Sequence, residues 1–413
     1  MSFRKKKVLL LSTHDSHLGG HAWSEMQQYD KTKYDVKLVS LYSLYDDTTY
    51  SIISRKFIYD VIDKVISNLS RLYYFRRRHN IYNKKYCYFN VHSFPIGAKT
   101  ILRKYNNGCP DIIVLHWYDG FITPKLITNL YRLTSAQIVF VFTDEYPLGG
   151  GCHYPCECEG FKYACENCPA LISNNQISAY RLREKIDLLK DIPKIVVSPL
   201  AGINKAKQSI VFKCNTEYIR YIPNIKLEVK LLDISLARNY FQISLDSFVV
   251  MYGAMHISEK RKGFDLFKEA IKIVSNKIPE KIVVVVAGNV TDLDIEANSI
   301  SIKYLGNLPF NDLCNLYSAS NVYVSSSIAD SGPMMVAYSI ACGTPVVSYP
   351  IGYAFDCVKH ENTGYIAEYA SIDDLANGIL YFYKNRDKQA AYRNNCIELN
   401  KILTETSFYG NNL

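Results

Sequence analysis

Short apolar runs alternate with helix-like segments along most of this 413-residue chain. The apolar runs are continuous, as in parallel strands that are covered on both faces. Strand–helix alternation of this kind predicts an α/β fold with parallel sheets and helices on both faces. Ligands of such sheets bind at the carboxyl ends of the strands. The predicted strands are 7–12, 35–41, 111–116, 137–143, 194–198, 248–252, 281–287, 301–305, 322–324 and 345–349. The predicted helices are 22–29, 52–72, 95–105, 123–133, 176–189, 264–274, 311–318, 333–342, 372–383 and 387–407.

A polar, irregular stretch at 226–244 separates two such alternations, and the length of the chain suits two domains. We therefore predict an N-terminal domain over 1–225, a C-terminal domain over 226–386 and a helical segment over 387–413. No apolar run approaches the roughly 18–20 residues that a membrane span requires. The first apolar run, 8–11, is too short for a secretory signal, which favours a cytoplasmic protein.

The stretch 321–350 combines a strand, a polar loop and a helix that Gly332-Pro333 introduces. Proline suits the first turn of a helix because its missing N–H costs little there. A helix reached directly from a strand presents free N–H groups, which suit an anion. Gly332, Pro333 and Met334 are therefore candidate binding residues.

Two basic residues stand directly before Gly263, in Arg261-Lys262-Gly263, at the turn between a predicted strand and a predicted helix. Two cations at a strand-to-helix turn can hold a diphosphate and stabilise the charge that it gains on leaving. The alternative is a pair of solvated basic residues in a loop. The net charge of +9 indicates attraction to an anionic partner without naming it.

Gly19 and Gly20 follow the first predicted strand, where paired glycines allow a close approach to a ligand. The alternative is a plain strand–helix turn. The pattern is not G-x-G-x-x-G, so a nicotinamide or flavin cofactor has no support. The spacing of His14, His17 and His21 fits no common metal site, and we interpret them as polar lining.

Five cysteines fall between 152 and 168, and Cys165-Glu166-Asn167-Cys168 forms a C-x-x-C pair. Tetrahedral zinc needs four ligands, and a C-x-x-C turn supplies two of them. Cys152 or Cys156 with Cys158 would supply the others, and our preferred set is Cys152, Cys158, Cys165 and Cys168. Disulfides and buried free thiols remain as alternatives.

The window 71–85 carries six basic residues, no acid and several interleaved aromatic residues. One interpretation is contact with an anionic membrane face or with a lipid-diphosphate acceptor, worth about 1 kcal/mol for each basic residue near the surface. The other is a solvated loop at the end of a helix.

Two stretches resemble family 4 retaining glycosyltransferases. The sugar-nucleotide half of that family has an acid, seven residues, a second acid, and then a small apolar run that ends in G-x-P-V-V. Here Asp330 is the first acid, Tyr338 replaces the second, and Ala341 to Val347 fit the tail. Residues 149–169 resemble the G-G-C-H-Y…C…C-x-x-C-P insertion of a polysaccharide-making subgroup, here a Cys-rich insertion over 149–170.

Two further positions depart from the family's pattern. Thr143 stands where members often have a histidine that faces the donor sugar. Lys262 matches the lysine before the glycine, whereas Ala254 occupies the usual place of the partner arginine, which Arg261 would replace. The resemblance implies catalytic roles for Asp330, Lys262 and Arg261, and donor-binding roles for Gly19, Gly20, Thr143, Gly332, Pro333, Met334 and Tyr338.

The resemblance also implies two Rossmann-like domains that face each other across a cleft (the GT-B arrangement), with the C-terminal helix crossing back to the first domain. The implied function is retaining transfer of a sugar from a nucleoside diphosphate to a polysaccharide or lipid-linked oligosaccharide acceptor. The setting would be polysaccharide assembly at the inner face of the cell membrane, with no catalytic metal, so that any zinc is structural.

Two other functions compete with sugar transfer. Thr143, Ala254 and Tyr338 favour a catalytically inactive sugar-nucleotide binder. The basic surface and the cysteines suggest a zinc-containing nucleic-acid binder. Against nucleic acid, the cysteines lack a regular finger spacing and the basic residues do not gather around them.

Overall fold

The computed structural model describes residues 4–15, 21–43, 51–53, 58, 60–62, 64–65, 83, 86–88, 93–172, 176–222, 230–289 and 300–406. Gly19, Gly20 and His17 lie outside this part of the chain, as does the basic window 71–85 except for Asn83. The chain divides into two compact units. The first comprises Met1–Ser198 and Gly202–Tyr221, and the second comprises Pro199–Ala201 and Ile222–Phe408.

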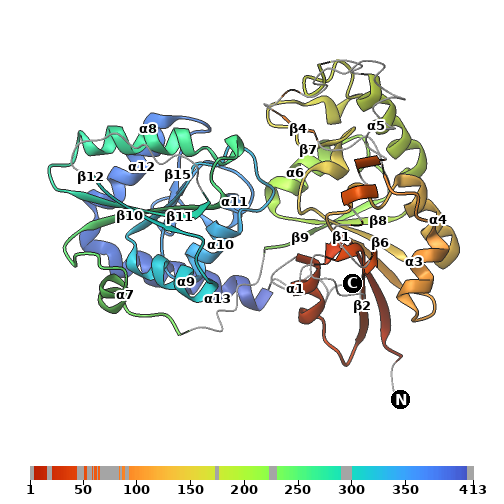
Figure 1. Cartoon of the computed structure of the whole chain (residues 1–413), viewed down its shortest axis with the longest axis horizontal. Helices are drawn as coiled ribbons and strands as arrows, with labels where there is room; N and C mark the ends of the chain where they lie inside the picture. Colours follow the sequence, from red (N-terminus) through yellow and green to blue (C-terminus); the bar gives the residue numbers. More distant parts are fainter. Residues whose placement is uncertain are drawn as a thin grey trace. The chain divides into compact units, whose positions relative to one another are not determined.

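The N-terminal unit contains a parallel sheet in the order β3-β2-β1-β5-β6-β8-β9 (Figure 1, red to yellow-green). Its described strands are β1 (Lys6–Asp15), β2 (Tyr34–Ser43), β3 (Ser51–Ile53), β5 (Ile112–Leu115), β6 (Gln137–Val141), β8 (Lys194–Ser198) and β9 (Thr216–Arg220). The helices around it are α1 (His21–Gln28), α3 (Ala98–Tyr105), α4 (Pro124–Thr134), α5 (Gln176–Leu189) and α6 (Leu200–Gln208). The predicted α/β architecture of this half is confirmed.

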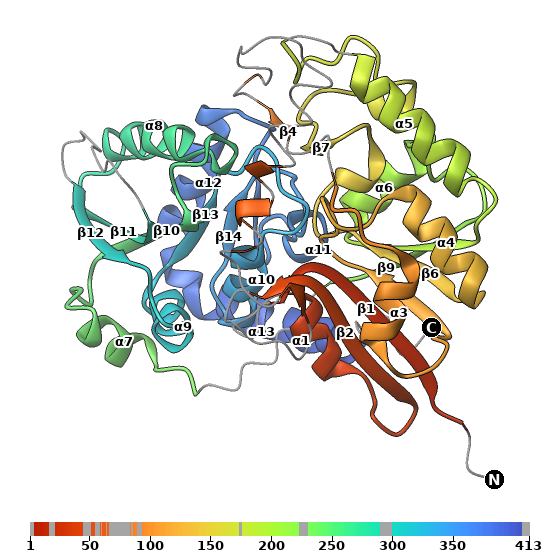
Figure 2. The same cartoon turned by 45° about the vertical axis from the view of Figure 1, so that its right-hand side comes forward.

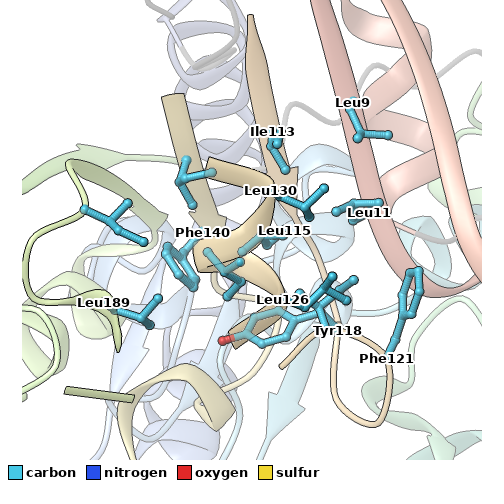
Figure 3. Packing of buried hydrophobic residues seen from close by; sticks show 14 of the residues in the cluster. Leu9, Leu11, Ile113, Leu115, Tyr118, Phe121, Leu126, Leu130, Phe140 and Leu189 are labelled. Carbon is cyan, nitrogen blue, oxygen red and sulfur yellow. The ribbon is translucent and has the colours of Figure 1, made fainter. Parts of the chain in front are cut away.

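The core of this unit forms where alternate strand residues meet the helices. Leu9 and Leu11 of β1 share one buried cluster with Phe140 of β6 and with Leu126 and Leu130 of α4 (Figure 3). Each such side chain contributes about 1.5–3 kcal/mol when it is fully buried. Continuous apolar strands are therefore stable here only because helices cover the sheet.

Two predictions fail at the edges of this sheet. The helix predicted at 52–72 is wrong at its start, because residues 51–53 form β3, parallel to β2. β9 was not predicted, since Thr216–Arg220 is a half-exposed edge strand without a continuous apolar run. Edge strands pair on one side only, and their composition need not be apolar. Short apolar runs therefore predict central strands better than edges.

Residues 149–172 contain little regular structure. A two-stranded antiparallel sheet joins β4 (Cys87–Tyr88) to β7 (Cys152–Tyr154). Short 3-10 turns lie at Tyr146–Leu148 and Gly160–Lys162. None of the five cysteines from 152 to 168 forms a disulfide in this structure, so the disulfide alternative is not formed.

The C-terminal unit contains a second parallel sheet, in the order β12-β11-β10-β13-β14-β15. Its described strands are β10 (Phe248–His256), β11 (Ile282–Asn289), β12 (Ile300–Gly306), β13 (Val322–Ser325), β14 (Val346–Ser348) and β15 (Gly364–Ile366). Its helices are α7 (Ile234–Tyr240), α8 (Phe264–Ser275), α9 (Phe310–Ala319), α10 (Met334–Ala341), α11 (Ala354–Cys357), α12 (Ile372–Lys384) and α13 (Gln389–Thr406).

Alternate residues of β10 supply the two faces of this sheet. Phe248, Val250 and Tyr252 share a buried cluster with residues of α8 and α12. Val249 and Met251 share another with residues of α9, α10 and α13. Figure 2 shows α8 and α12 together on one face of the sheet, with α9 on the other. The sheet is therefore buried on both faces, as its apolar strands predict.

Several local signals act as the sequence predicts. The Ser371 side chain accepts a hydrogen bond from the Asp374 N–H and caps α12, and α10 ends just before Gly343. The prediction that 226–244 is irregular is wrong in part, because this stretch contains α7, which Asp233 caps. Among the described residues, no helix is long and apolar enough to cross a bilayer. The path of α13 back to the first domain stays a prediction.

Candidate functional site

The turn after β10 is locked against the loop after β13. Gly263 has φ +68, and a Cβ atom there would lie 1.9 Å from the Ser326 carbonyl oxygen, so only glycine fits. The Ser326 hydroxyl donates to the Gly263 carbonyl at 2.7 Å, and the Ile328 N–H donates to the Arg261 carbonyl at 2.8 Å. These contacts hold Arg261 and Lys262, which precede Gly263, close to the loop after β13.

Three predicted residues meet at this point, although they lie far apart in the sequence. Arg261 Nη1 lies 3.0 Å and Lys262 Nζ 2.5 Å from Asp330 Oδ2. The Gly332 N–H donates to the other oxygen, Asp330 Oδ1, at 3.1 Å. Arg261 Nη2 also pairs with Glu259 Oε2 at 2.7 Å. The result is a charged cluster at the carboxyl ends of β10 and β13, which are neighbours in the sheet.

The cluster is largely withdrawn from solvent. The side chain of Asp330 is 8% exposed, against 18% for Arg261 and 19% for Lys262. Burial alone would raise the pKa of Asp330, but Lys262 and Arg261 outweigh it and hold this pKa below its ordinary value. Asp330 is therefore ionised at neutral pH. Two partly buried cations on one carboxylate are suited to an incoming anion that competes with that carboxylate.

The N-terminus of α10, which the sequence predicts as an anion-binding position, lies beside this cluster. Pro333 is the N-cap of α10, with φ −65, and Met334 begins the helix. A Cβ atom on Gly332 would lie 2.5 Å from the Tyr353 ring, so the chain passes closer to that ring than any other residue would allow. Gly332 therefore has a packing role as well as the predicted binding role.

Tyr338 lies on α10, four residues (about one helical turn) after the helix begins at Met334. Its ring packs edge-on against Phe310 of α9, with the ring centroids 5.1 Å apart. It is partly buried on the apolar cluster that also includes Met334, and burial raises its pKa. The contacts of this side chain in the structure are packing contacts.

A second charged cluster lies in the N-terminal unit, and sequence reasoning missed it. The buried His153 of β7 places Nε2 3.0 Å from Asp119 Oδ2, and its Nδ1 is paired with Asp144 Oδ2. Burial opposes protonation, but Asp144 and Asp119 outweigh it and raise the pKa of His153 to about 9. At neutral pH an imidazolium therefore stands between two buried carboxylates.

This second cluster reaches the predicted residue Thr143. The Trp117 ring packs against His153 at a tilted angle, with the centroids 4.7 Å apart, and the Trp117 backbone N–H donates to Thr143 Oγ1 at 3.2 Å. The Thr13 hydroxyl, at the end of β1, donates to the Asp119 carbonyl at 2.8 Å. Thr13 lies near the end of β1, Asp119 follows β5 and Asp144 follows β6. Polar residues at the ends of the predicted strands were therefore the signal that could have revealed this part of the cluster, though not His153.

The cysteines of 149–172 fall into a group of four and one outlier. Cys152, Cys158, Cys165 and Cys168 line a single cavity of about 20 Å³. Cys156 is not among its lining residues, and its thiol donates instead to the Tyr154 carbonyl at 3.7 Å. No group of three or more His, Cys, Asp or Glu in the described ranges is already arranged to hold a metal ion.

One part of the chain matches a known protein family. Residues 245–399 match the family model "Glycosyl transferases group 1". This match is less than half of the chain, and it contains the cluster of Arg261, Lys262 and Asp330. None of the curated proteins matches the chain.

Solved glycosyltransferase structures share the fold over nearly the whole chain. Sucrose-phosphate synthase from Thermosynechococcus elongatus has a TM-score of 0.59 at 15% identity, covering 97% of this chain and 95% of its own. A glycosyltransferase from Rickettsia africae ESF-5 has a TM-score of 0.59 at 15% identity, covering 99% and 96%. Anabaena Alr3699/HepE, in complex with UDP-glucose, has a TM-score of 0.56 at 14% identity, covering 97% and 98%. The predicted fold class, GT-B with two Rossmann-like α/β domains, is confirmed.

Proposed function

We propose that this chain is a retaining glycosyltransferase that moves a sugar, a hexose by preference, from a nucleoside diphosphate to an oligosaccharide or lipid-linked acceptor. The observation that carries the proposal is the cluster of Arg261, Lys262 and Asp330 inside the segment that matches glycosyl transferases group 1. The complex of the Anabaena protein with UDP-glucose supports a nucleotide-sugar donor. Membership of family 4, in the polysaccharide-making subgroup, remains part of this proposal.

The charged cluster supplies the chemistry that such a transfer needs. When the bond between the anomeric carbon and the diphosphate oxygen breaks, the diphosphate gains negative charge. Lys262 and Arg261 would stabilise that charge in a site with little access to water, where such contacts are strong. Asp330 holds both cations in place beforehand and would then face the donor sugar. The proposed transfer step uses no metal.

The setting that we propose is polysaccharide assembly at the inner face of the cell membrane. Its support is the basic, aromatic composition of 71–85, which suits an anionic lipid surface or a lipid-diphosphate acceptor. Gly19, Gly20 and Thr143 are proposed to line the donor or acceptor side of the N-terminal unit. For Thr143, the bond with the Trp117 N–H supports this placement beside a polar cluster.

A thermal-shift screen against nucleoside diphosphates, their sugars and the bare nucleosides tests donor binding. A ligand at 100 times its Kd stabilises the folded state by about 2.7 kcal/mol, so a true donor should raise Tm clearly. Bare nucleosides should have much less effect, because they lack the diphosphate that Lys262 and Arg261 would hold. If no diphosphate raises Tm more than its nucleoside, the proposed donor site is wrong. Binding without turnover would favour the inactive sugar-nucleotide binder, and binding of nucleic acid alone would favour the third alternative.

Replacing Tyr338 by phenylalanine should weaken donor binding only several-fold. The substitution keeps the ring that packs against Phe310 and removes one hydroxyl. A neutral hydrogen bond is worth roughly 0.5–1.5 kcal/mol, which is at most about a tenfold change in Kd. Calorimetric titration with the donor measures the effect. A much larger loss of affinity would contradict the packing role and restore Tyr338 as a principal nucleotide contact.

A further inference from the structure

We propose that residues 149–172 bind one zinc ion through Cys152, Cys158, Cys165 and Cys168. Of the five cysteines in this segment, these four line one cavity and Cys156 does not. Four thiolates are the ligand set of a closed, structural zinc site. The proposal concerns the N-terminal unit and does not depend on glycosyl transfer.

The size of the cavity restricts what it can hold. Its volume of about 20 Å³ exceeds the roughly 10–15 Å³ that one water molecule requires. It is far below the roughly 300–1,000 Å³ of small-molecule pockets. The cavity therefore holds no more than a single ion or water molecule, and the four cysteines among its lining residues favour a thiophilic ion over Mg²⁺ or Ca²⁺.

Backbone N–H groups already point at two of the sulfur atoms. The Gly160 N–H donates to Cys158 Sγ at 3.4 Å, and the Gly150 N–H donates to Cys165. Donors of this kind orient ligands and stabilise their charged form around a bound metal. A cluster that served only as apolar packing would not need them.

A buried cation offsets the charge of the proposed site. Four thiolates and Zn²⁺ together carry two net negative charges, which are costly in an apolar setting. Lys185 is buried and donates to the Gly149 carbonyl at 2.7 Å and to the Tyr146 carbonyl at 2.5 Å. Its electrostatic partners are Asp119 first, and then Cys165 and Asp144, so its charge serves the carboxylates around His153 as well as the proposed site.

Binding requires only small movements. The sulfur atoms are free thiols, not yet placed as a ligand set. Each can swing about one side-chain torsion while the backbone stays in place. Without metal, the segment has a small core of its own, formed by Cys168, Ala170, Leu171 and Ile177. Zinc would therefore fix β7, and with it the adjacent His153.

Metal analysis of the full-length chain, prepared without a histidine tag from zinc-supplemented cells, tests the proposal. We expect one zinc per chain in the wild type and in Cys156→Ser, and less than about a tenth of that in Cys165→Ser or Cys168→Ser. Cys156→Ser is the matched control, because it removes a thiol from the same segment but not from the cavity.

A second measurement covers ligand variants that fail to fold. Titrating wild-type protein with a mercurial should release one zinc as four thiols react, which a chromophoric chelator records. Cobalt substitution should give the intense visible absorption of tetrahedral cobalt thiolate. Zinc well below one per chain, with no uptake of either metal after reduction, would overturn the proposal. In that case, titration of all twelve cysteines of the unfolded chain indicates free thiols, and a count lower by four indicates disulfides.

Discussion

Lys262→Ala should lower kcat by about 10²–10³ while leaving the fold intact, since losing one donor that stabilises developing charge typically has this effect. The ammonium group of Lys262 lies 2.5 Å from Asp330 and would face the leaving diphosphate. Asp330 would keep Arg261 as a partner at 3.0 Å, so the buried carboxylate would not be left unpaired. Steady-state kinetics with the donor found by the thermal-shift screen measures the loss.

Lys260→Ala is the matched control for this variant. Lys260 lies in the same 3-10 turn, but it is exposed. Its removal should change turnover less than about twofold, because exposed charges are screened by solvent. Equal losses in the two variants would indicate a general effect of surface charge. Near-normal turnover in a folded Lys262→Ala variant would show that Lys262 does not stabilise the leaving diphosphate.

His153→Gln should lower the free energy of unfolding of the N-terminal unit by about 3–5 kcal/mol, the usual effect of removing one partner from a buried ion pair. The imidazolium of His153 separates Asp119 from Asp144, and all three side chains are at most 8% exposed. Glutamine carries no charge, so the two buried carboxylates would lose their counter-ion. The local fold around β7 would then loosen first.

Tryptophan fluorescence during urea unfolding measures this effect. Both tryptophans of the chain, Trp23 and Trp117, belong to the N-terminal unit, so their emission follows that unit. His256→Gln, at an exposed position in the other unit, is the control and should leave the midpoint unchanged. Adding Asp119→Asn to His153→Gln should restore part of the stability, because it removes one of the unpaired charges. An unchanged midpoint in His153→Gln would show that the ion pairs contribute no net stability.

The central strands and the charged cluster were predictable for the same reason. Buried parallel strands require continuous apolar runs, and chemistry-bearing residues gather where such strands end. Arg261-Lys262 and Asp330 follow β10 and β13, which the structure pairs directly. Each motif could be read locally, and the sheet order then brings them together.

The cluster around His153 was not predictable in that way. Asp119 and Asp144 follow predicted strands, but His153 comes from a segment with few local structural signals. Its partners are set by how β7 lies in the fold, and no spacing in the sequence records that position. The edge strand β9 was missed for a related reason, because a half-exposed strand does not need the continuous apolar run that identifies a central strand.

The close approach of Gly263 to Ser326 has a consequence for how this protein can change over generations. The contact leaves no room for a side chain, so the two loops that carry Arg261, Lys262 and Asp330 are held as a single part. Substitutions within such a part are not additive, and coupling between touching residues reaches about 0.5–3 kcal/mol. A new ligand preference at this charged cluster is therefore not reached by changing one residue at a time. Selection or engineering must alter the cations and the carboxylate together, and the glycine between them stays fixed throughout.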